Sequence, residues 1–218
     1  MLNEPLFVLA GGLGTRLRSA VSDVPKPLAP VHNKPFLQYL LEDWREQGAS
    51  DFVFLIHHQS DLVEDFVSAL FASASFRNCR ARLVREPTLL GTGGAVANAI
   101  KELAYEGTFL LANADTWLPG SLQRLGTSTE PAMAIVEVDN LSRYGGVTIE
   151  GGMIKMFIEK GKEGAGAINA GLYRLCARDF PQTGAAYSLE RDILPNLVES
   201  GVLSAVLLNG PFIDIGIP

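Results

Sequence analysis

The sequence predicts an α/β protein with three layers, in which helices cover both faces of a mostly parallel mixed sheet, a Rossmann-like arrangement. Short apolar runs rich in Val, Ile, Leu and Phe alternate with longer segments in which apolar residues recur at helical spacing. Polar and glycine-rich motifs follow several of these runs, as expected where ligands gather at the carboxyl ends of parallel strands. With 218 residues, of which 47% are hydrophobic, the chain can bury one sizeable core, and we expect a single domain over residues 1–218.

The first half of the chain supplies the alternation of strands and helices. We expect strands over residues 6–10, 52–57, 81–85 and 109–113, and helices over residues 35–47, 61–71 and 94–103. In the first helix, Phe36, Leu40 and Trp44 recur on one face, which predicts that this face packs on the sheet. Pro35 is favoured at a first helical position, and Gly48 is placed to end the helix.

The second half predicts strands that follow one another more closely. After Pro131 we expect strands over residues 132–138, 146–149, 154–159 and 168–175, which adds antiparallel or mixed pairing to the sheet. A last helix over residues 189–199 is expected to begin after Ser188, a favoured N-cap, with the acidic residues Glu190 and Asp192 in its first turn. A final strand is expected over residues 203–208.

The overall charge and the cysteine content argue against several classes of function. The formal net charge is −6, which disfavours binding to nucleic acid or to a membrane surface, because both need a basic patch. The two cysteines, Cys79 and Cys176, lie far apart and lack the spacing of a metal site or a disulfide framework. The sequence shows no signal peptide and no apolar run long enough to span a membrane. We therefore expect a cytoplasmic protein, and the sequence leaves its assembly into a homo-oligomer open.

A glycine-dense turn follows the first predicted strand. It reads Leu9-Ala10-Gly11-Gly12-Leu13-Gly14-Thr15-Arg16-Leu17. Its glycines allow several backbone N–H groups to converge on one anion, so the turn is expected to bind a phosphate. It lacks the Gly-Lys-Ser/Thr of a Walker P-loop and the glycine spacing of a dinucleotide-binding turn. The motif therefore predicts phosphate binding of another kind.

Two cations near this turn strengthen the prediction of a phosphate site. Arg16 lies within the turn, and its planar guanidinium matches phosphate oxygens. Lys26 stands between Pro25 and Pro27, whose rings restrict the backbone around it. A rigidly held cation is suited to a phosphate, whereas a lysine in an ordinary loop would be solvated.

These residues resemble the sugar-1-phosphate nucleotidyltransferases, whose first motif begins Gly-Gly-x-Gly-Thr-Arg-Leu and ends Pro-Lys-Pro. The resemblance continues in the motifs Gly91-Thr92-Gly93-Gly94-Ala95, Asn113-Ala114-Asp115, Tyr144-Gly145, Glu159-Lys160, Asn169-Ala170-Gly171-Leu172-Tyr173 and Phe212-Ile213-Asp214-Ile215-Gly216. Within the family, several of these motifs are most similar to those of the D-glycero-α-D-manno-heptose 1-phosphate guanylyltransferases. Two positions depart from the family pattern: Ala114 replaces the glycine of Asn-Gly-Asp, and Gly161 replaces the proline of Glu-Lys-Pro.

The resemblance implies a glycosyltransferase-A-like nucleotidyltransferase that transfers GMP from GTP to a sugar 1-phosphate and releases pyrophosphate. It implies a Mg²⁺ cofactor held by Asp115 and Asp214, whose oxygens are of the type that Mg²⁺ prefers. Arg16 would hold the pyrophosphate and Lys26 would meet charge at the α-phosphate, so that Arg16, Lys26 and Asp115 form the catalytic set. The residues implied to bind the nucleotide are Leu9, Ala10, Gly11, Gly12, Gly14, Thr15, Arg16, Lys26, Glu86, Gly91 and Thr92. Those implied to bind the sugar phosphate are Asn113, Tyr144, Gly145, Glu159, Lys160, Asn169 and Gly171.

Glu86 determines the predicted choice of base. It follows the third predicted strand, and in the resembling enzymes this position faces the edge of the base. An ionised carboxylate only accepts hydrogen bonds, and guanine presents two adjacent donors, N1–H and N2–H, on its pairing edge. The residue therefore predicts GTP as the preferred donor, whereas a solvated glutamate at a strand end would carry no such preference.

The sequence is also compatible with functions other than this one. The same chemistry could act on another sugar or base, as in a mannose 1-phosphate guanylyltransferase or a uridylyl- or thymidylyltransferase. A catalytically silent nucleotide-sugar sensor would use the same pocket, but it need not retain the two cations and the two carboxylates. A dinucleotide-dependent oxidoreductase is excluded by the glycine spacing and by His57 at the end of the second strand, where that class has an acidic residue.

Overall fold

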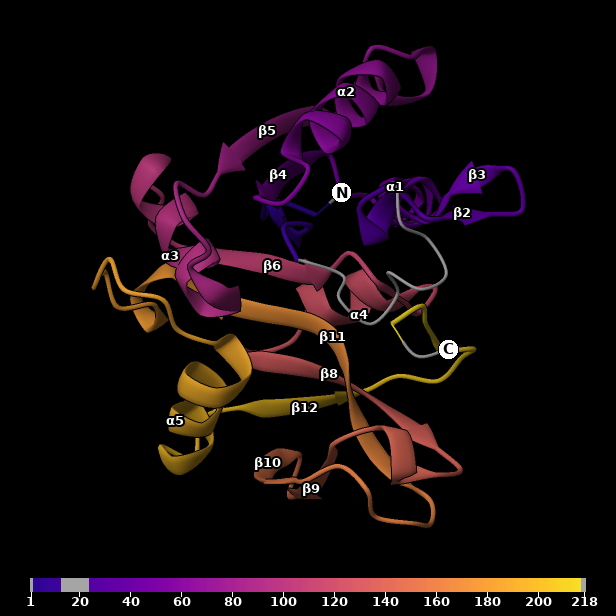
Figure 1. Ribbon diagram of the computed structural model, residues 1–218. Coiled ribbons are helices and arrows are strands. Elements are labelled where there is room, and N and C mark those ends of the chain that lie inside the picture. The colour runs from indigo at the N-terminus through magenta and orange to yellow at the C-terminus, as the bar shows by residue number, and fades with distance from the viewer. Residues whose placement is uncertain (1, 13–23, 217–218) are drawn as a thin grey trace.

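The computed structural model describes residues 2–12 and 24–216 (Figure 1). Within these residues, nine strands form one mixed sheet in the order β5-β4-β1-β6-β11-β8-β12-β10-β9. The predicted α/β fold with helices on both faces of a mixed sheet is confirmed. The first predicted turn lies only partly within the described residues, because Gly14, Thr15 and Arg16 fall outside them.

The first half of the chain forms a parallel block at one side of the sheet. β1 pairs in parallel with β4 and β6, and β4 pairs in parallel with β5. These strands are β1 (Leu6–Leu9), β4 (Asp51–Ile56), β5 (Arg80–Arg85) and β6 (Thr108–Asn113). Each boundary lies within one residue of its prediction. In β1, β4 and β6 the apolar runs are buried on both faces, which is a clear signal of a central parallel strand.

The second half adds antiparallel pairing, as predicted. Its strands are β8 (Ala132–Val138), β9 (Gly146–Glu150), β10 (Met153–Ile158), β11 (Gly166–Cys176) and β12 (Ser204–Leu207). β11 runs antiparallel to β6, β8 and β9 and so joins the two halves, while β12 is parallel to β8. The pairing of β11 with β8 shifts register between Asn169 and Tyr173, where Gly171 has a φ of +75°. This bulge bends the long strand, and its positive φ requires a residue such as glycine.

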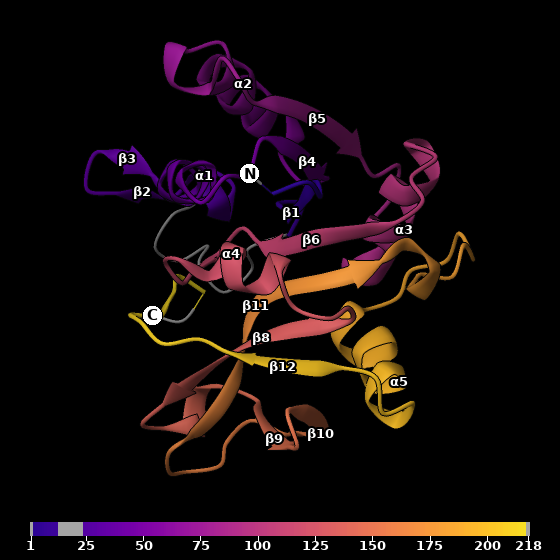
Figure 2. The same cartoon turned by 180° about the vertical axis from the view of Figure 1, so that it is seen from behind.

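Helices cover both faces of the sheet, and their apolar faces form two core clusters. The cluster on one face includes residues of α1 (Phe36–Glu46), α2 (Ser60–Phe71) and α4 (Ser121–Gly126). The cluster on the other face includes residues of α3 (Gly91–Glu102), a π-helical turn (Leu189–Ile193) and α5 (Leu194–Glu199). Along β1, Leu6 and Val8 belong to the first cluster and Phe7 to the second, as the alternation of a strand requires. Figure 2 shows the side on which α4 lies over the sheet.

The helix boundaries correct four details of the sequence prediction. Pro35 is the N-cap of α1 rather than its first helical residue, and α3 begins at Gly91 rather than at residue 94. The predicted helix over residues 189–199 is divided into the π-helical turn and α5, although Ser188 caps its start as expected. The short helix α4 was not predicted, because six residues do not display a helical period.

Several short elements connect the main ones. Three-residue 3₁₀ helices span Lys26–Leu28, Ala74–Phe76, Leu141–Arg143 and Ala177–Asp179. Two small ribbons lie outside the main sheet: β2 (Pro30–Val31) pairs with β3 (Lys34–Pro35), and β7 (Thr116–Trp117) pairs with β13 (Ile213–Asp214). Among the helices of the described ranges, none combines the length and the apolar character that crossing a membrane would need.

Candidate active site

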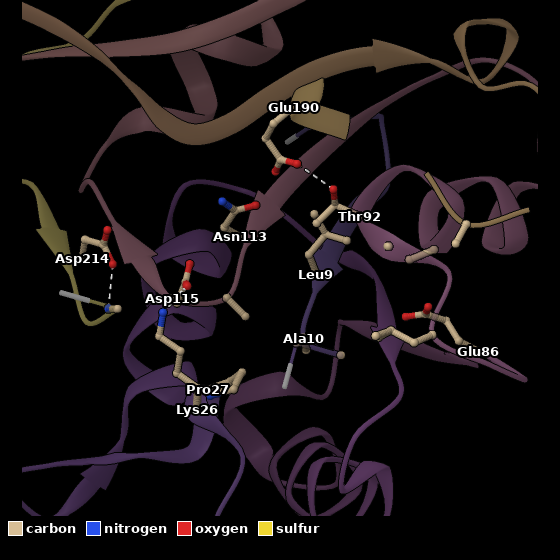
Figure 3. Close-up of a pocket in the computed structure, with 18 of the residues that line it drawn as sticks. Leu9, Ala10, Lys26, Pro27, Glu86, Thr92, Asn113, Asp115, Glu190 and Asp214 are labelled. Carbon is tan, nitrogen blue, oxygen red and sulfur yellow. Dashed lines mark hydrogen bonds and ion pairs between the residues drawn. The ribbon is translucent and has the colours of Figure 1, made fainter. Parts of the chain in front are cut away.

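A cavity of about 660 Å³ opens at the carboxyl ends of β1 and β6 and at the start of α3 (Figure 3). Predicted site residues form much of its wall, namely Leu9, Ala10, Gly11, Gly12, Lys26, Glu86, Gly91, Thr92, Asn113, Asp115, Lys160 and Asp214. The cavity is therefore the place where the sequence motifs meet. Tyr144, Gly145, Glu159, Asn169 and Gly171 are not part of the lining.

The two predicted metal-binding carboxylates are brought together by the β7–β13 ribbon. Asp115 follows β6, and the antiparallel ribbon aligns Asp214 with Thr116, the next residue along the chain. The N–H of Ile215 donates to the carbonyl of Asp115 at 3.0 Å, which holds the two segments together. Asp214 therefore reaches Asp115 through this separate two-stranded ribbon and not through the main sheet.

Lys26 occupies the same corner of the cavity. It begins the 3₁₀ helix after Pro25, and its ammonium forms an ion pair with the Asp115 carboxylate. The N–H of Gly216 donates to Asp214 Oδ1 at 2.6 Å. A Cβ atom at Gly216 would collide with the Lys26 ammonium and lie 2.8 Å from Asp214 Oδ1. Glycine at position 216 therefore allows Lys26 and both carboxylates to share one corner.

The electrostatics of this corner suit a divalent cation. Burial raises the pKa of Asp214, the Gly216 N–H lowers it, and the nearby Asp115 carboxylate raises it again. Lys26 and Lys160 oppose these increases. The oxygens of these two carboxylates are the hard donors that Mg²⁺ prefers. No group of three or more His, Cys, Asp or Glu side chains that could bind a metal exists in the described ranges.

The opposite end of the cavity holds a buried glutamate. Glu86 is 7% exposed, and its Oε2 accepts a hydrogen bond from the N–H of Leu90 at 3.0 Å. Burial raises the pKa of this carboxyl, while the Leu90 N–H and His57 lower it. A Cβ atom at Gly11 would lie 3.0 Å from Glu86 Oε1, so the glycine lets the first turn approach the carboxylate closely. The interpretation of Glu86 as a solvated strand end is therefore wrong.

The second glycine motif forms the first turn of α3 rather than an open loop. The N–H groups of Gly93 and Gly94 both donate to the carbonyl of Tyr187, at 3.0 and 3.2 Å. A Cβ atom at Gly91, whose φ is +74°, would lie 2.6 Å from the same carbonyl oxygen. These glycines allow residues 185–187 to pass across the start of α3, and the two N–H groups are already satisfied within the protein.

Of the residues predicted to bind the sugar phosphate, Asn113 and Lys160 line the cavity. Asn169 is outside the lining: its Nδ2 donates to the Tyr173 hydroxyl at 2.8 Å, and its Oδ1 accepts from the N–H of Gly171 at 2.9 Å. A Cβ atom at Gly171 would lie 2.8 Å from Asn113 Nδ2, so this glycine leaves room for the Asn113 side chain. Tyr144 packs edge-on against Phe212, with ring centroids 6.0 Å apart.

The other two predicted residues lie near Lys160. A Cβ atom at Gly145 would lie 3.3 Å from the carbonyl oxygen of Ile158 and 4.0 Å from Lys160 Cγ, while Glu159 is exposed.

The cavity also contains a carboxylate that the sequence argument did not assign to the site. Glu190 belongs to the lining, and its Oε2 accepts a hydrogen bond from the Thr92 hydroxyl at 2.7 Å. In the sequence it is indistinguishable from an ordinary acidic residue in the first turn of a helix. Its contact with Thr92 spans 98 positions, and no local pattern reveals such a contact.

The strand ends of this α/β sheet surround a lysine, two carboxylates and a buried glutamate, an arrangement typical of ligand sites in α/β enzymes. The family model described as nucleotidyl transferase matches residues 6–216, and the chain belongs to this family.

Relatives extend over nearly the whole chain. The D-glycero-alpha-D-manno-heptose 1-phosphate guanylyltransferase of Campylobacter jejuni is 30% identical over 97% of this chain and 94% of the relative. The probable mannose-1-phosphate guanylyltransferase 1 of Oryza sativa is also 30% identical, over 97% of this chain and 61% of the relative. The crystal structure of HddC from Yersinia pseudotuberculosis, complexed with GMP-PN, is 33% identical with a TM-score of 0.85, covering 99% of this chain and 95% of that one.

Proposed function

We propose that the chain transfers GMP from GTP to D-glycero-α-D-manno-heptose 1-phosphate in a Mg²⁺-dependent reaction, giving a GDP-sugar and pyrophosphate. The observation that carries the proposal is the cavity in which Lys26, Asp115 and Asp214 share one corner while Glu86 lies at the other end. The names of the Campylobacter jejuni relative and of the complexed Yersinia pseudotuberculosis structure support the choice of a guanine nucleotide. We expect the reaction to take place in the cytoplasm.

The chemistry requires positioning and charge neutralisation more than proton transfer. A sugar phosphate is largely dianionic at neutral pH because its second pKa is about 6, so it attacks without a general base. One of its oxygens forms a bond to the α-phosphorus of GTP, and the bond from this phosphorus to the oxygen that leads to the β-phosphorus breaks. The electron pair of that bond leaves with pyrophosphate on the opposite side.

The residues of the charged corner fit these requirements. The flanking prolines restrict the backbone at Lys26, and the ion pair with Asp115 holds its ammonium, which can then stabilise charge at the α-phosphate. Asp115 and Asp214 would hold Mg²⁺, which when bound offsets the negative charge of the phosphate oxygens. Lys160, in the same lining, is placed to receive the phosphate of the sugar. Arg16 is proposed to hold the pyrophosphate and lies outside the described residues.

Glu86 provides the proposed choice of base. Its Oε2 is tied to the Leu90 N–H, which fixes the orientation of the carboxylate. In this orientation it can accept the N1–H and N2–H of guanine, whereas uracil or thymine would place a carbonyl oxygen beside it. Discrimination of this kind is strong, because a wrong base leaves a buried polar group unpaired.

One assay tests the proposal directly. The protein is incubated with Mg²⁺, each common nucleoside triphosphate and either the heptose 1-phosphate, mannose 1-phosphate or glucose 1-phosphate, and pyrophosphate release is measured. We expect release with GTP and the heptose 1-phosphate to exceed all other combinations. Faster turnover of mannose 1-phosphate would instead support the activity named for the Oryza sativa relative. Binding of GTP without release of pyrophosphate from any pair would support a catalytically silent sensor.

A further inference from the structure

Glu190 is a charged residue in the wall of the cavity that the proposed mechanism does not use. It belongs to the π-helical turn Leu189–Ile193, which lies directly before α5. π-helical turns are rare and are frequently found at functional sites. Figure 3 shows its carboxylate beside Thr92 and Asn113, across the cavity from Lys26.

The Glu190 side chain is held by one of its two oxygens. Oε2 accepts hydrogen bonds from the hydroxyls of Thr92 and Ser188, at 2.7 and 2.8 Å. Within the described part of the chain, Oε1 has no hydrogen-bond donor and no cation lies within ion-pair distance of the carboxylate. Oε1 is therefore available to a bound molecule.

The backbone that carries Glu190 is fixed against the start of α3. The N–H of Leu189 donates to the Thr92 hydroxyl oxygen at 2.9 Å, and the Leu189 side chain is fully buried. The preceding carbonyl, of Tyr187, accepts the N–H groups of Gly93 and Gly94. The backbone position of Glu190 is therefore fixed, as is required of a residue that determines ligand specificity.

The Glu190 carboxylate is exposed to solvent in the cavity, so a ligand must supply hydrogen-bond donors to bind it. The carboxylate accepts hydrogen bonds only, so it repels phosphate oxygens and attracts hydroxyl groups. The ligand groups that fit Glu190 are therefore hydroxyls.

The geometry of in-line transfer indicates which substrate carries these hydroxyls. The sugar phosphate must attack from the side opposite to the leaving pyrophosphate. Lys26 lies on one side of the cavity, and Glu190 with Asn113 lies on the other (Figure 3). Asn113 is among the residues predicted to bind the sugar phosphate, and it lies beside Glu190 (Figure 3), so a sugar bound at Asn113 would present its hydroxyls to Glu190.

We propose that Glu190 is a specificity-determining residue whose Oε1 accepts hydrogen bonds from hydroxyls of the sugar, while Thr92 and Ser188 hold Oε2. This inference rests on the proposed nucleotidyl transfer and adds a sugar contact to it. The matched control is Glu199, an exposed glutamate at the end of α5 that is not part of the cavity lining.

The test compares wild type, Glu190→Gln, Glu190→Ala and Glu199→Gln on D-glycero-α-D-manno-heptose 1-phosphate and its 2-, 3- and 4-deoxy analogues. We expect wild type to disfavour at least one deoxy analogue by roughly 10- to 10²-fold in kcat/KM, and Glu190→Ala to lose most of that preference. KM for the natural sugar phosphate should rise by a similar factor, KM for GTP should change little, and Glu199→Gln should behave as wild type.

A purely structural role would leave the ranking of the deoxy analogues unchanged in the Glu190 variants, and that result would overturn the inference. So would a rise in KM for GTP alone. The same comparison is made by calorimetric binding of the sugar phosphates in the presence of Mg²⁺ and a non-hydrolysable GTP analogue. This readout keeps the two proposals separate: absence of turnover by wild type refutes the proposed reaction, whereas unaltered selectivity of the variants in binding refutes the role of Glu190.

Discussion

The two ends of the cavity hold acidic residues in different surroundings. At one end, Asp115 and Asp214 lie beside Lys26, with Lys160 close enough to affect the pKa of Asp214. At the other end, the Glu86 carboxylate accepts one hydrogen bond from a backbone N–H and has His57 nearby. The first end gathers several charges that a polyanion and a cation can rearrange, whereas the second holds a single carboxylate in a fixed orientation.

This difference indicates that the charged end of the cavity serves catalysis and that the Glu86 end serves the choice of nucleotide base. Charges that interact with one another can stabilise a transition state in which phosphate charge is redistributed. An isolated buried acceptor instead rejects any base that cannot supply donors. We therefore expect substitutions at the charged end to reduce turnover and substitutions at Glu86 to change the choice of nucleotide.

The largest effect is expected at the two metal-binding carboxylates. Asp115→Asn or Asp214→Asn should lower kcat by roughly 10³-fold or more, because a metal ion at a phosphoryl group contributes several kcal/mol of charge stabilisation. Wild type in excess chelator should lose activity to the same extent, as measured by pyrophosphate release. Asp65→Asn, on the exposed side of α2, is the matched control. Full turnover by either variant would show that the charged end does not carry the chemistry.

Lys26→Ala should have the next largest effect. One preorganised charge donor at a transition state contributes about 3 kcal/mol, so kcat should fall by roughly 10²-fold while KM changes less. Lys155→Ala, an exposed lysine on β10, serves as the control. A rise in KM at constant kcat would make Lys26 a contact to the bound substrate and not a catalytic residue.

Glu86→Gln should change the nucleotide preference more than the turnover. Loss of the charged acceptor is expected to lower kcat/KM for GTP by roughly 10- to 10²-fold and to narrow the gap to UTP and dTTP. Competition assays with mixed nucleotides measure this ratio, and Glu102→Gln, an exposed residue at the end of α3, is the control. An unchanged base preference would contradict the assignment of Glu86.

The smallest effect concerns stability. Because burial raises the pKa of Glu86 above its ordinary value of 4.5, the folded state binds the proton more tightly than the unfolded state. The ionised carboxylate therefore costs stability at neutral pH, and Glu86→Gln should raise the free energy of unfolding by about 1 kcal/mol.

This gain should depend on pH. It should shrink as the pH falls through the raised pKa of the folded state and disappear below the ordinary value, where wild type is protonated in both states. Urea denaturation at about pH 7.5 and about pH 5 tests the sign. A gain that is the same at both values would show that the ionisation of Glu86 is not the cause.

The parallel block of the sheet and the positions of the main motifs could be predicted from the sequence alone. Apolar runs such as those of β1 and β6 stand out because a central parallel strand is buried on both faces. Lys26 between its prolines and Asp115 after β6 could be selected as site residues, because the chemistry of phosphates restricts which side chains can serve there.

The sequence alone could not predict which of these residues lie together in one site, because that depends on the tertiary structure. Asp214 reaches Asp115 through the pairing of β13 with β7, and Glu190 reaches Thr92 across 98 positions. The glycines at the start of α3 leave room for the backbone of Tyr187. From the sequence, this glycine motif was expected to contact a nucleotide. The physical reason is common to all three cases. The spacing of apolar residues along one segment predicts its secondary structure and its buried face. A contact between distant segments instead depends on how the whole sheet and its connections pack.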